Sequence, residues 1–195
     1  MMDVSEQLRA TARALERWAG GEGLELLSRA ARMVASSIRG GGKLMLCGNG
    51  GSAADCQHVA AEFTCRLSKR LERPPMGALA LTTDTSFLTA CSNDYSFDLV
   101  FSRQVRALGL RGDVLMGIST GGSSRNVVLA LEEARSMGIS TIALTRSGGA
   151  IASMADLALE VEDSDTAVIQ NVHLALEHAL CFLVEDLLFG GDGAC

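Results

Sequence analysis

The sequence predicts an α/β domain with a doubly wound, five-stranded parallel sheet and an N-terminal helical extension. Short apolar runs alternate with segments whose apolar residues have helical spacing, and two of those runs end in glycine-rich polar loops. The composition agrees, because 48% of the residues are apolar and only 4% are aromatic, which suits helices packed on buried parallel strands. The 195 residues suffice for one domain (1–195), with the extension over 1–40 and the α/β core over 43–189.

The extension is predicted to be a helical hairpin over residues 3–18 and 22–39. Apolar residues recur in both segments at intervals of three or four, and glycines follow each of them. These amphipathic helices have more apolar surface than one side of a sheet requires. We therefore expect them to pack against other copies of the chain in a symmetric homotetramer.

The core alternates strands and helices. The expected strands are Lys43–Cys47, Met76–Leu81, Asp113–Ile118, Ser140–Leu144 and Leu157–Val161. The expected helices follow the loop after Cys47 and cover Asp84–Ser92, Phe97–Leu108, Ser123–Met137 and 166–188. This order predicts parallel strands joined by helical crossovers.

Charge and targeting signals narrow the location and the partners. The net charge of −6 argues against nucleic acid or an anionic membrane as a partner. The N-terminus has no apolar signal core, and we expect no apolar run to be long enough to span a bilayer. The six cysteines have no C-x-x-C spacing and most lie in apolar segments, which favours reduced thiols. We expect a cytoplasmic protein.

Two loops are candidates for ligand binding, because ligands of such sheets bind at the carboxyl ends of strands. The first contains Asn49, Gly50, Gly51 and Ser52. The second contains Ser119, Thr120, Gly121 and Ser124, and its hydroxyl and amide groups converge at a helix N-terminus that favours an anion such as phosphate. Neither loop has P-loop or dinucleotide-binding spacing. One such loop is more often a capped turn, but two on one sheet favour a ligand.

Two expected helices carry side chains suited to acid–base or metal chemistry. His58 and Glu62 are four residues apart and share one helix face. Gln170 and His178 are eight residues apart on the last helix, about 12 Å along its axis. A lone histidine of this kind is more often a packing residue, and a lone glutamate a surface charge. The apolar neighbours of Glu62 favour an inward position.

The stretches CGNGGSAADCQHVAAEF, SND and GDVLMGIST, with Gln170 and His178, resemble the phosphoheptose isomerases of the SIS (sugar isomerase) family. The resemblance covers nearly the whole chain. It implies the SIS fold and a homotetramer that converts D-sedoheptulose 7-phosphate to D-glycero-D-manno-heptose 7-phosphate, in heptose biosynthesis for lipopolysaccharide or another glycan.

The resemblance also implies site residues. Substrate would be bound by Asn49, Gly50, Gly51, Ser52, Glu62, Arg66, Asn93, Asp94, Ser119, Thr120, Gly121, Ser124 and Gln170. One zinc ion per subunit would be bound by His58, Glu62, Gln170 and His178. Glu62 would be the base and His178 the acid, with Asp94 as the next candidate for the base. Gln170 and His178 would approach one ion from opposite sides, or one of them would act across a subunit interface.

One departure from the family pattern concerns the second loop. The family has Ser-Thr-Ser-Gly-Asn-Ser where this chain has Ser-Thr-Gly-Gly-Ser-Ser, so Gly121 removes a hydroxyl group and Ser123 replaces an asparagine. A related sugar phosphate is therefore an alternative substrate. A second alternative is a non-catalytic SIS protein that binds a replication initiator, but such relatives lack the glutamate and histidine. A sugar-phosphate-sensing regulator would need a further domain.

Overall fold

A computed structural model describes residues 4–190 of the chain. Its five strands are β1 (Leu44–Gly48), β2 (Ala78–Ala80), β3 (Val114–Ser119), β4 (Ser140–Arg146) and β5 (Leu157–Val161). They form one sheet in the order β2-β1-β3-β4-β5, and every neighbouring pair is parallel. The expected five-stranded parallel sheet is confirmed.

The strand order places the two predicted loops side by side. From β1 the chain crosses to β2 on one side and later returns to β3 on the other, so the direction of winding reverses between β1 and β3. Gly48 at the end of β1 is in register with Ile118 near the end of β3. The loops after these strands therefore meet at the point of the carboxyl edge where doubly wound sheets bind ligands.

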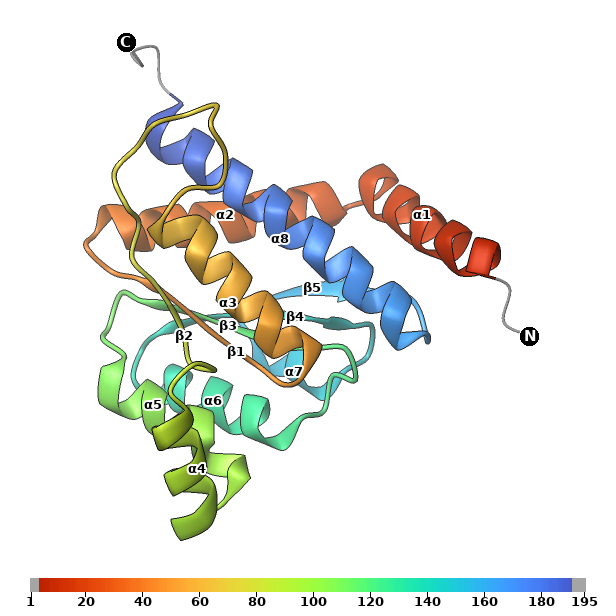
Figure 1. The fold of residues 1–195 in the computed structure, drawn as a ribbon. Helices are drawn as coiled ribbons and strands as arrows, with labels where there is room; N and C mark the ends of the chain where they lie inside the picture. Colours follow the sequence, from red (N-terminus) through yellow and green to blue (C-terminus); the bar gives the residue numbers. More distant parts are fainter. Residues whose placement is uncertain (1–3, 191–195) are drawn as a thin grey trace.

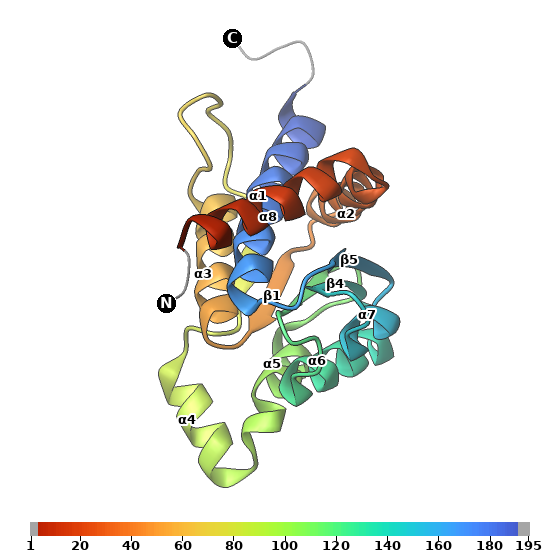
Figure 2. The same ribbon diagram turned by 90° about the vertical axis from the view of Figure 1, so that its right-hand side faces the viewer.

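Helices cover both faces of the sheet (Figures 1 and 2). One layer consists of α1 (Val4–Gly20), α2 (Gly23–Arg39), α3 (Gly51–Thr64) and α8 (Thr166–Phe189). The other consists of α5 (Val100–Leu108), α6 (Arg125–Ser136) and α7 (Ala150–Met154). Between β2 and α5 lie α4 (Thr85–Asp94) and the short 3₁₀ helix η1 (Phe97–Leu99). Both views show α4 projecting from the body.

The core has two parts, one on each face of the sheet. Along β1, Leu44 and Leu46 join the cluster under α2, α3 and α8, whereas Met45 and Cys47 join the cluster under α5 and α6. All of β1 and β3 is buried, as expected for central strands of a parallel sheet covered on both sides. The sheet is therefore a rigid base for the loops at its carboxyl edge.

The hairpin expected at the N-terminus is wrong. In both views α1 leads away from α2 instead of folding back along it (Figures 1 and 2). The apolar side of α1 packs elsewhere: Trp18 is nearly buried and its ring nitrogen donates to the Glu160 carbonyl of β5 at 2.8 Å. This contact with the sheet edge decides the direction of α1.

The expectation that no apolar segment is long enough to span a bilayer is wrong for α8, because its length and composition are sufficient for a membrane span. Half of the apolar stretch is buried inside the domain, where it packs on α2 and α3 and contributes residues such as Val172 and Val184 to the core. We therefore interpret α8 as the central helix of its layer.

The cysteines agree with the expectation of reduced thiols over the described residues. Cys47, Cys56, Cys91 and Cys181 are buried, Cys65 is exposed, and all five are free thiols. Burial raises the pKa of Cys47 to about 12, so this thiol stays protonated at neutral pH. Cys195 lies outside the described residues.

Candidate active site

Three of the four expected metal-binding and catalytic side chains gather between α3 and α8. The Nε2 atoms of His58 and His178 are 2.8 Å apart, and the two rings meet edge to face with centroids 5.0 Å apart. Glu62 Oε1 lies 3.8 Å from His58 Nε2. The predicted i,i+4 pair on α3 therefore does face a histidine that is 120 positions later in the sequence.

Glu62 has a free carboxylate oxygen in this cluster. Its side chain is 15% exposed, against 43% for His58, and its Oε2 atom is buried with no hydrogen-bond partner. A buried oxygen of this kind costs free energy unless a ligand or a proton satisfies it. The arrangement thus leaves one carboxylate oxygen available beside two imidazoles.

Gln170 lies apart from the other three. Its Nε2 atom donates to Asp55 Oδ2 at 2.6 Å, and its amide is so close to the start of α3 that a Cβ on Gly51 would collide with it. Asp55 was not among the expected site residues. Burial raises the pKa of Asp55, while the Gln170 hydrogen bond and the charge of His58 act in the opposite direction.

The donors suit zinc by type, with two imidazole nitrogens and a carboxylate oxygen. Among the described residues, however, no three His, Cys, Asp or Glu side chains are close enough together to form a metal site as they stand. The two Nε2 atoms are at hydrogen-bonding distance instead. Binding an ion between the two Nε2 atoms would therefore require the histidine rings to separate, whereas Gln170, whose Nε2 donates to Asp55, would offer its amide oxygen.

The first loop is held by a pair of amides. Asn49 and Asn126 donate to each other through their side chains at 2.9 Å in both directions, which joins the loop after β1 to the start of α6. Gly50 has a φ of 56°, which favours glycine, and no side chain caps the start of α3. The first backbone N–H groups of α3 are therefore open to a ligand. Ser52 is buried behind them.

The second loop has the features of an anion site. Ser119 Oγ accepts from the Gly122 N–H at 3.0 Å and lies 3.1 Å from Ser124 Oγ. Ser124 is the N-cap of α6, yet its side chain makes no capping bond. The helix therefore begins with unsatisfied N–H groups next to two hydroxyls, which is a favourable setting for a phosphate. Thr120 belongs to the same loop. A Cβ on Gly121 would meet no atom within 4 Å.

Three expected residues lie outside this assembly. Arg66 pairs with Glu72 at 3.0 Å in the exposed segment after α3. The Asn93 amide donates to the Asp94 carboxylate at 2.8 Å, and both residues are exposed at the end of the projecting helix α4. Within the described chain, they are therefore not brought to the cluster formed by His58, Glu62 and His178.

Buried ionisable residues on the inner side of α8 were missed by the sequence analysis. Glu177 is 1% exposed and His173 is fully buried, and none of their side-chain polar atoms has a partner. Burial raises the pKa of Glu177 to about 8 and lowers that of His173 to about 4, so both are uncharged at neutral pH. Their i,i+4 spacing was visible in the sequence, but it did not reveal burial.

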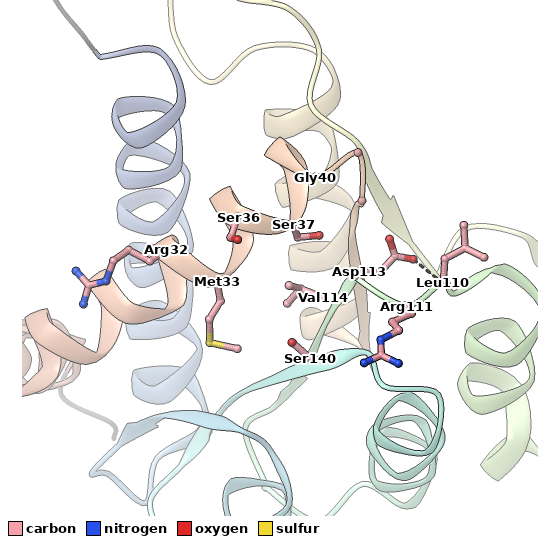
Figure 3. Close-up of a pocket in the computed structure, with 13 residues that line it drawn as sticks. Arg32, Met33, Ser36, Ser37, Gly40, Leu110, Arg111, Asp113, Val114 and Ser140 are labelled. Atoms are coloured by element: carbon pink, nitrogen blue, oxygen red, sulfur yellow. Dashed lines mark hydrogen bonds between the residues drawn. The ribbon is translucent and has the colours of Figure 1, made fainter.

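A hollow at the opposite end of the sheet is not part of this assembly. Its volume is about 610 Å³, and it lies at the amino ends of the strands, between α2 and the start of β3 (Figure 3). Arg32 and Arg111 point away from each other there. Because ligands of doubly wound sheets bind at the carboxyl ends of the strands, we place the candidate site at the carboxyl-edge loops and the α3–α8 cluster.

Comparison with known proteins identifies the family. Residues 9–146 match the family model described as SIS domain. A phosphoheptose isomerase of Nitratidesulfovibrio vulgaris strain Hildenborough is 52% identical over 160 residues, covering 82% of this chain and 76% of that protein. The solved phosphoheptose isomerase of Neisseria gonorrhoeae is 46% identical with a TM-score of 0.82, covering 93% of this chain and 94% of that one.

A second solved structure gives the same answer. The phosphoheptose isomerase of Francisella tularensis is 35% identical, with a TM-score of 0.88 over 94% of this chain and 96% of that one. Sequence, sheet topology and overall structure therefore agree over nearly the full length of the chain. The chain belongs to the SIS-domain family and, within it, to the phosphoheptose isomerases.

Proposed function

We propose that this chain converts D-sedoheptulose 7-phosphate to D-glycero-D-manno-heptose 7-phosphate in the cytoplasm. The observation that supports this reaction most directly is that Glu62 of α3 and His178 of α8 both lie against His58, in a chain about half identical to named phosphoheptose isomerases. A ketose and an aldose interconvert when one group removes a carbon-bound proton and another protonates the carbonyl oxygen.

Glu62 is the proposed base. In the forward direction its free carboxylate oxygen takes a proton from C1 of the ketose, while His178 gives a proton to the oxygen on C2. Glu62 then gives its proton to C2 of the resulting enediol, while His178 takes the proton from the C1 oxygen, which gives the aldehyde. Without a metal, His58 and His178 are at hydrogen-bonding distance with one proton between them, and His58 can then return a proton to His178.

Zinc is a further part of the proposal. His58, Glu62 and His178 would hold it, with the amide oxygen of Gln170 as the fourth donor. Bound there, zinc would polarise the carbonyl and stabilise the negative charge on the enediolate oxygen. Chelation should then reduce turnover, with zinc restoring it.

The phosphate of the substrate is assigned to Ser119, Thr120, Gly121 and Ser124, with Asn49, Gly50, Gly51 and Ser52 contacting the sugar. The first loop lies at the start of α3, and the second lies beside it at the start of α6. Glu62 is eleven residues after Gly51, about 16 Å further along α3. One copy alone thus holds the loops and the acid–base cluster far apart. A second copy that supplies one of these parts would shorten that distance.

We therefore propose a homotetramer with shared sites. The exposed positions of Arg66, Asn93 and Asp94 suit residues that reach the substrate of a neighbouring copy. Exposed apolar residues on the N-terminal helices, Val4, Leu8 and Leu24, suit burial between copies. Light scattering should give four chains per particle at micromolar concentration, and a monomer with full activity would contradict the shared site.

The decisive experiment follows aldose formation from sedoheptulose 7-phosphate, together with exchange of the C1 proton with solvent. Glu62→Gln keeps the shape of the side chain but cannot accept a proton, and should lower both rates by roughly 10²–10⁴-fold. Glu132→Gln, a matched change at an exposed position of α6, should leave them unchanged. Exchange at the parent rate in Glu62→Gln would move the base elsewhere, with Asp94 tested next.

The two alternative functions predict different results in the same assay. A non-catalytic binder of a replication initiator would show neither aldose formation nor proton exchange. An isomerase for a related sugar phosphate would be slow on the seven-carbon substrate and faster on another ketose phosphate. The absent hydroxyl at Gly121 is the feature that favours this second possibility.

A further inference from the structure

Arg73 is a buried arginine outside the proposed set of substrate and metal contacts. It lies in the segment between α3 and β2, and its side chain is 1% exposed. Its guanidinium donates four hydrogen bonds: to Glu185 Oε1 at 2.7 Å and to the backbone carbonyls of Glu62, Phe63 and Pro74 at 2.6, 2.8 and 3.1 Å. A buried charge with this many bonds is held in one orientation.

Two of these bonds stabilise the end of α3. The helix ends at Thr64, and the last carbonyl groups of a helix have no partner inside it. Arg73 supplies partners to the carbonyls of Glu62 and Phe63. The residue proposed as the base is therefore bonded through its own backbone to this guanidinium.

The other side of the guanidinium reaches α8. Glu185 is 7% exposed in its side chain and lies seven residues after His178. Seven residues are close to two helical turns, so Glu185 and His178 share the face of α8 that meets α3, about 10 Å apart along the axis. Arg73 thus joins the helix that carries Glu62 to the helix that carries His178.

The surroundings of Cys181 agree with this placement. Burial raises the pKa of the Cys181 thiol, and the carboxylates of Glu62, Glu177 and Glu185 raise it further, while Arg73 opposes them. These carboxylates therefore surround one point of α8, and Arg73 is the cation among them. Without it, Glu185 would be a buried charge near the proposed base.

We propose that Arg73, paired with Glu185, is a positioning residue that sets the distance and orientation of Glu62 relative to His178. The inference rests on the proposed function, because it concerns the same acid–base pair. A buried ion pair is often no more stabilising than apolar residues of similar volume, so stability alone explains the pair poorly. The planar guanidinium, in contrast, can bind a carboxylate and helix carbonyls simultaneously in a fixed geometry.

The test compares Arg73→Lys with the parent protein. Lysine keeps the charge but, as a compact ammonium group, cannot reproduce the bonds to Glu185 and to both helix carbonyls. We expect kcat to fall about 10²-fold, the usual cost of displacing a reacting group by about 1 Å, with KM changed less than threefold because the phosphate loop is remote. Lys43→Met is the matched control, since Lys43 pairs with the buried Asp113 at 2.6 Å at the amino end of β1, and it should retain the parent kcat.

A second readout reports the geometry without activity. The chain has only three histidines, so the ring nitrogens of His58 and His178 can be followed by NMR in protein labelled with ¹⁵N-histidine. We expect Arg73→Lys to shift the signals of the His58–His178 pair and Lys43→Met to leave them in place, with and without a chelator. An inactive parent would refute the proposed reaction, while the NMR comparison would still test the positioning role.

The outcomes separate positioning from stability. If Arg73→Lys fails to fold, the double change Arg73→Met with Glu185→Leu replaces the buried pair by apolar groups that can restore folding. That variant should form the same oligomer and still lose kcat. Parent kcat in either folded variant would overturn the proposal, and so would a loss of kcat with unchanged signals of the histidine pair.

Discussion

Glu177 should make the protein less stable as the pH rises through neutrality. Its carboxyl group is 1% exposed, neither oxygen has a partner, and burial raises its pKa from 4.5 to about 8. Between these two values the folded state keeps a proton that the unfolded state has released. The free energy of unfolding therefore falls with rising pH across this window, by at most ~5 kcal/mol at ~1.36 kcal/mol per pH unit.

His173 has the opposite effect at lower pH. Burial lowers its pKa from 6.5 to about 4, so in that range the unfolded state binds a proton that the folded state does not. Stability is then lost as the pH falls from 6.5 towards 4. Above pH 6.5 the protonation of Glu177, but not of His173, still differs between the two states. The effect of Glu177 can therefore be tested between pH 6.5 and 8, where the free energy of unfolding should fall by ~2 kcal/mol.

The assay is urea unfolding of the parent and Glu177→Gln at pH 6.5 and 8, at one protein concentration because assembly affects stability. Glutamine has the same shape and stays neutral, so the variant should not lose the ~2 kcal/mol of unfolding free energy that the parent loses between pH 6.5 and pH 8. Glu132→Gln, at an exposed site on α6, should follow the parent. Equal pH dependence of the parent and Glu177→Gln would refute the reasoning.

The remaining predictions concern the loops and the metal. Gly51→Ala should displace the Gln170 amide and lower activity, measured as kcat/KM. Gly121→Ser meets open space and adds a hydroxyl, so it should lower KM for the sugar phosphate without loss of stability. Ser119→Ala with Ser124→Ala should raise KM at nearly constant kcat, and unchanged substrate binding would refute the phosphate site. Exhaustive chelation should reduce turnover, and full activity without detectable metal would leave a metal-free acid–base site.

The fold was predictable where the apolar pattern has one explanation. Leu44, Met45 and Leu46 are fully buried, and a continuous apolar run this short, bounded by glycines, favours a central strand over a helix. The pattern does not show which surface an amphipathic helix covers, so α1 was placed against α2 although Trp18 binds the edge of β5. The five-residue helix α7 was missed because one turn has too few residues to show a period.

Part of the candidate site was predictable for a similar reason. Helical spacing placed His58 and Glu62 on one face, and in the structure His58 lies near both Glu62 and His178. The spacing says nothing about which side chains form hydrogen bonds. Gln170 was therefore assigned to the metal although its amide binds Asp55, and Arg73 was not singled out because its partners are a distant carboxylate and backbone carbonyls. The metal and substrate roles of these residues stay predictions.

The division of the proposed site into two parts, which a second copy of the chain would bring closer together, suits the proposed substrate. In a seven-carbon sugar 7-phosphate, the carbons that exchange protons and the phosphate are at opposite ends of the chain. An enzyme for such a substrate needs an anion site and an acid–base pair that are apart, each fixed independently. The first is built on the ends of β1 and β3, where the sheet holds the loops. The second lies between α3 and α8, where the Arg73–Glu185 pair bridges the two helices. Changes in the loops should therefore act mainly on KM, and changes in the helices mainly on kcat.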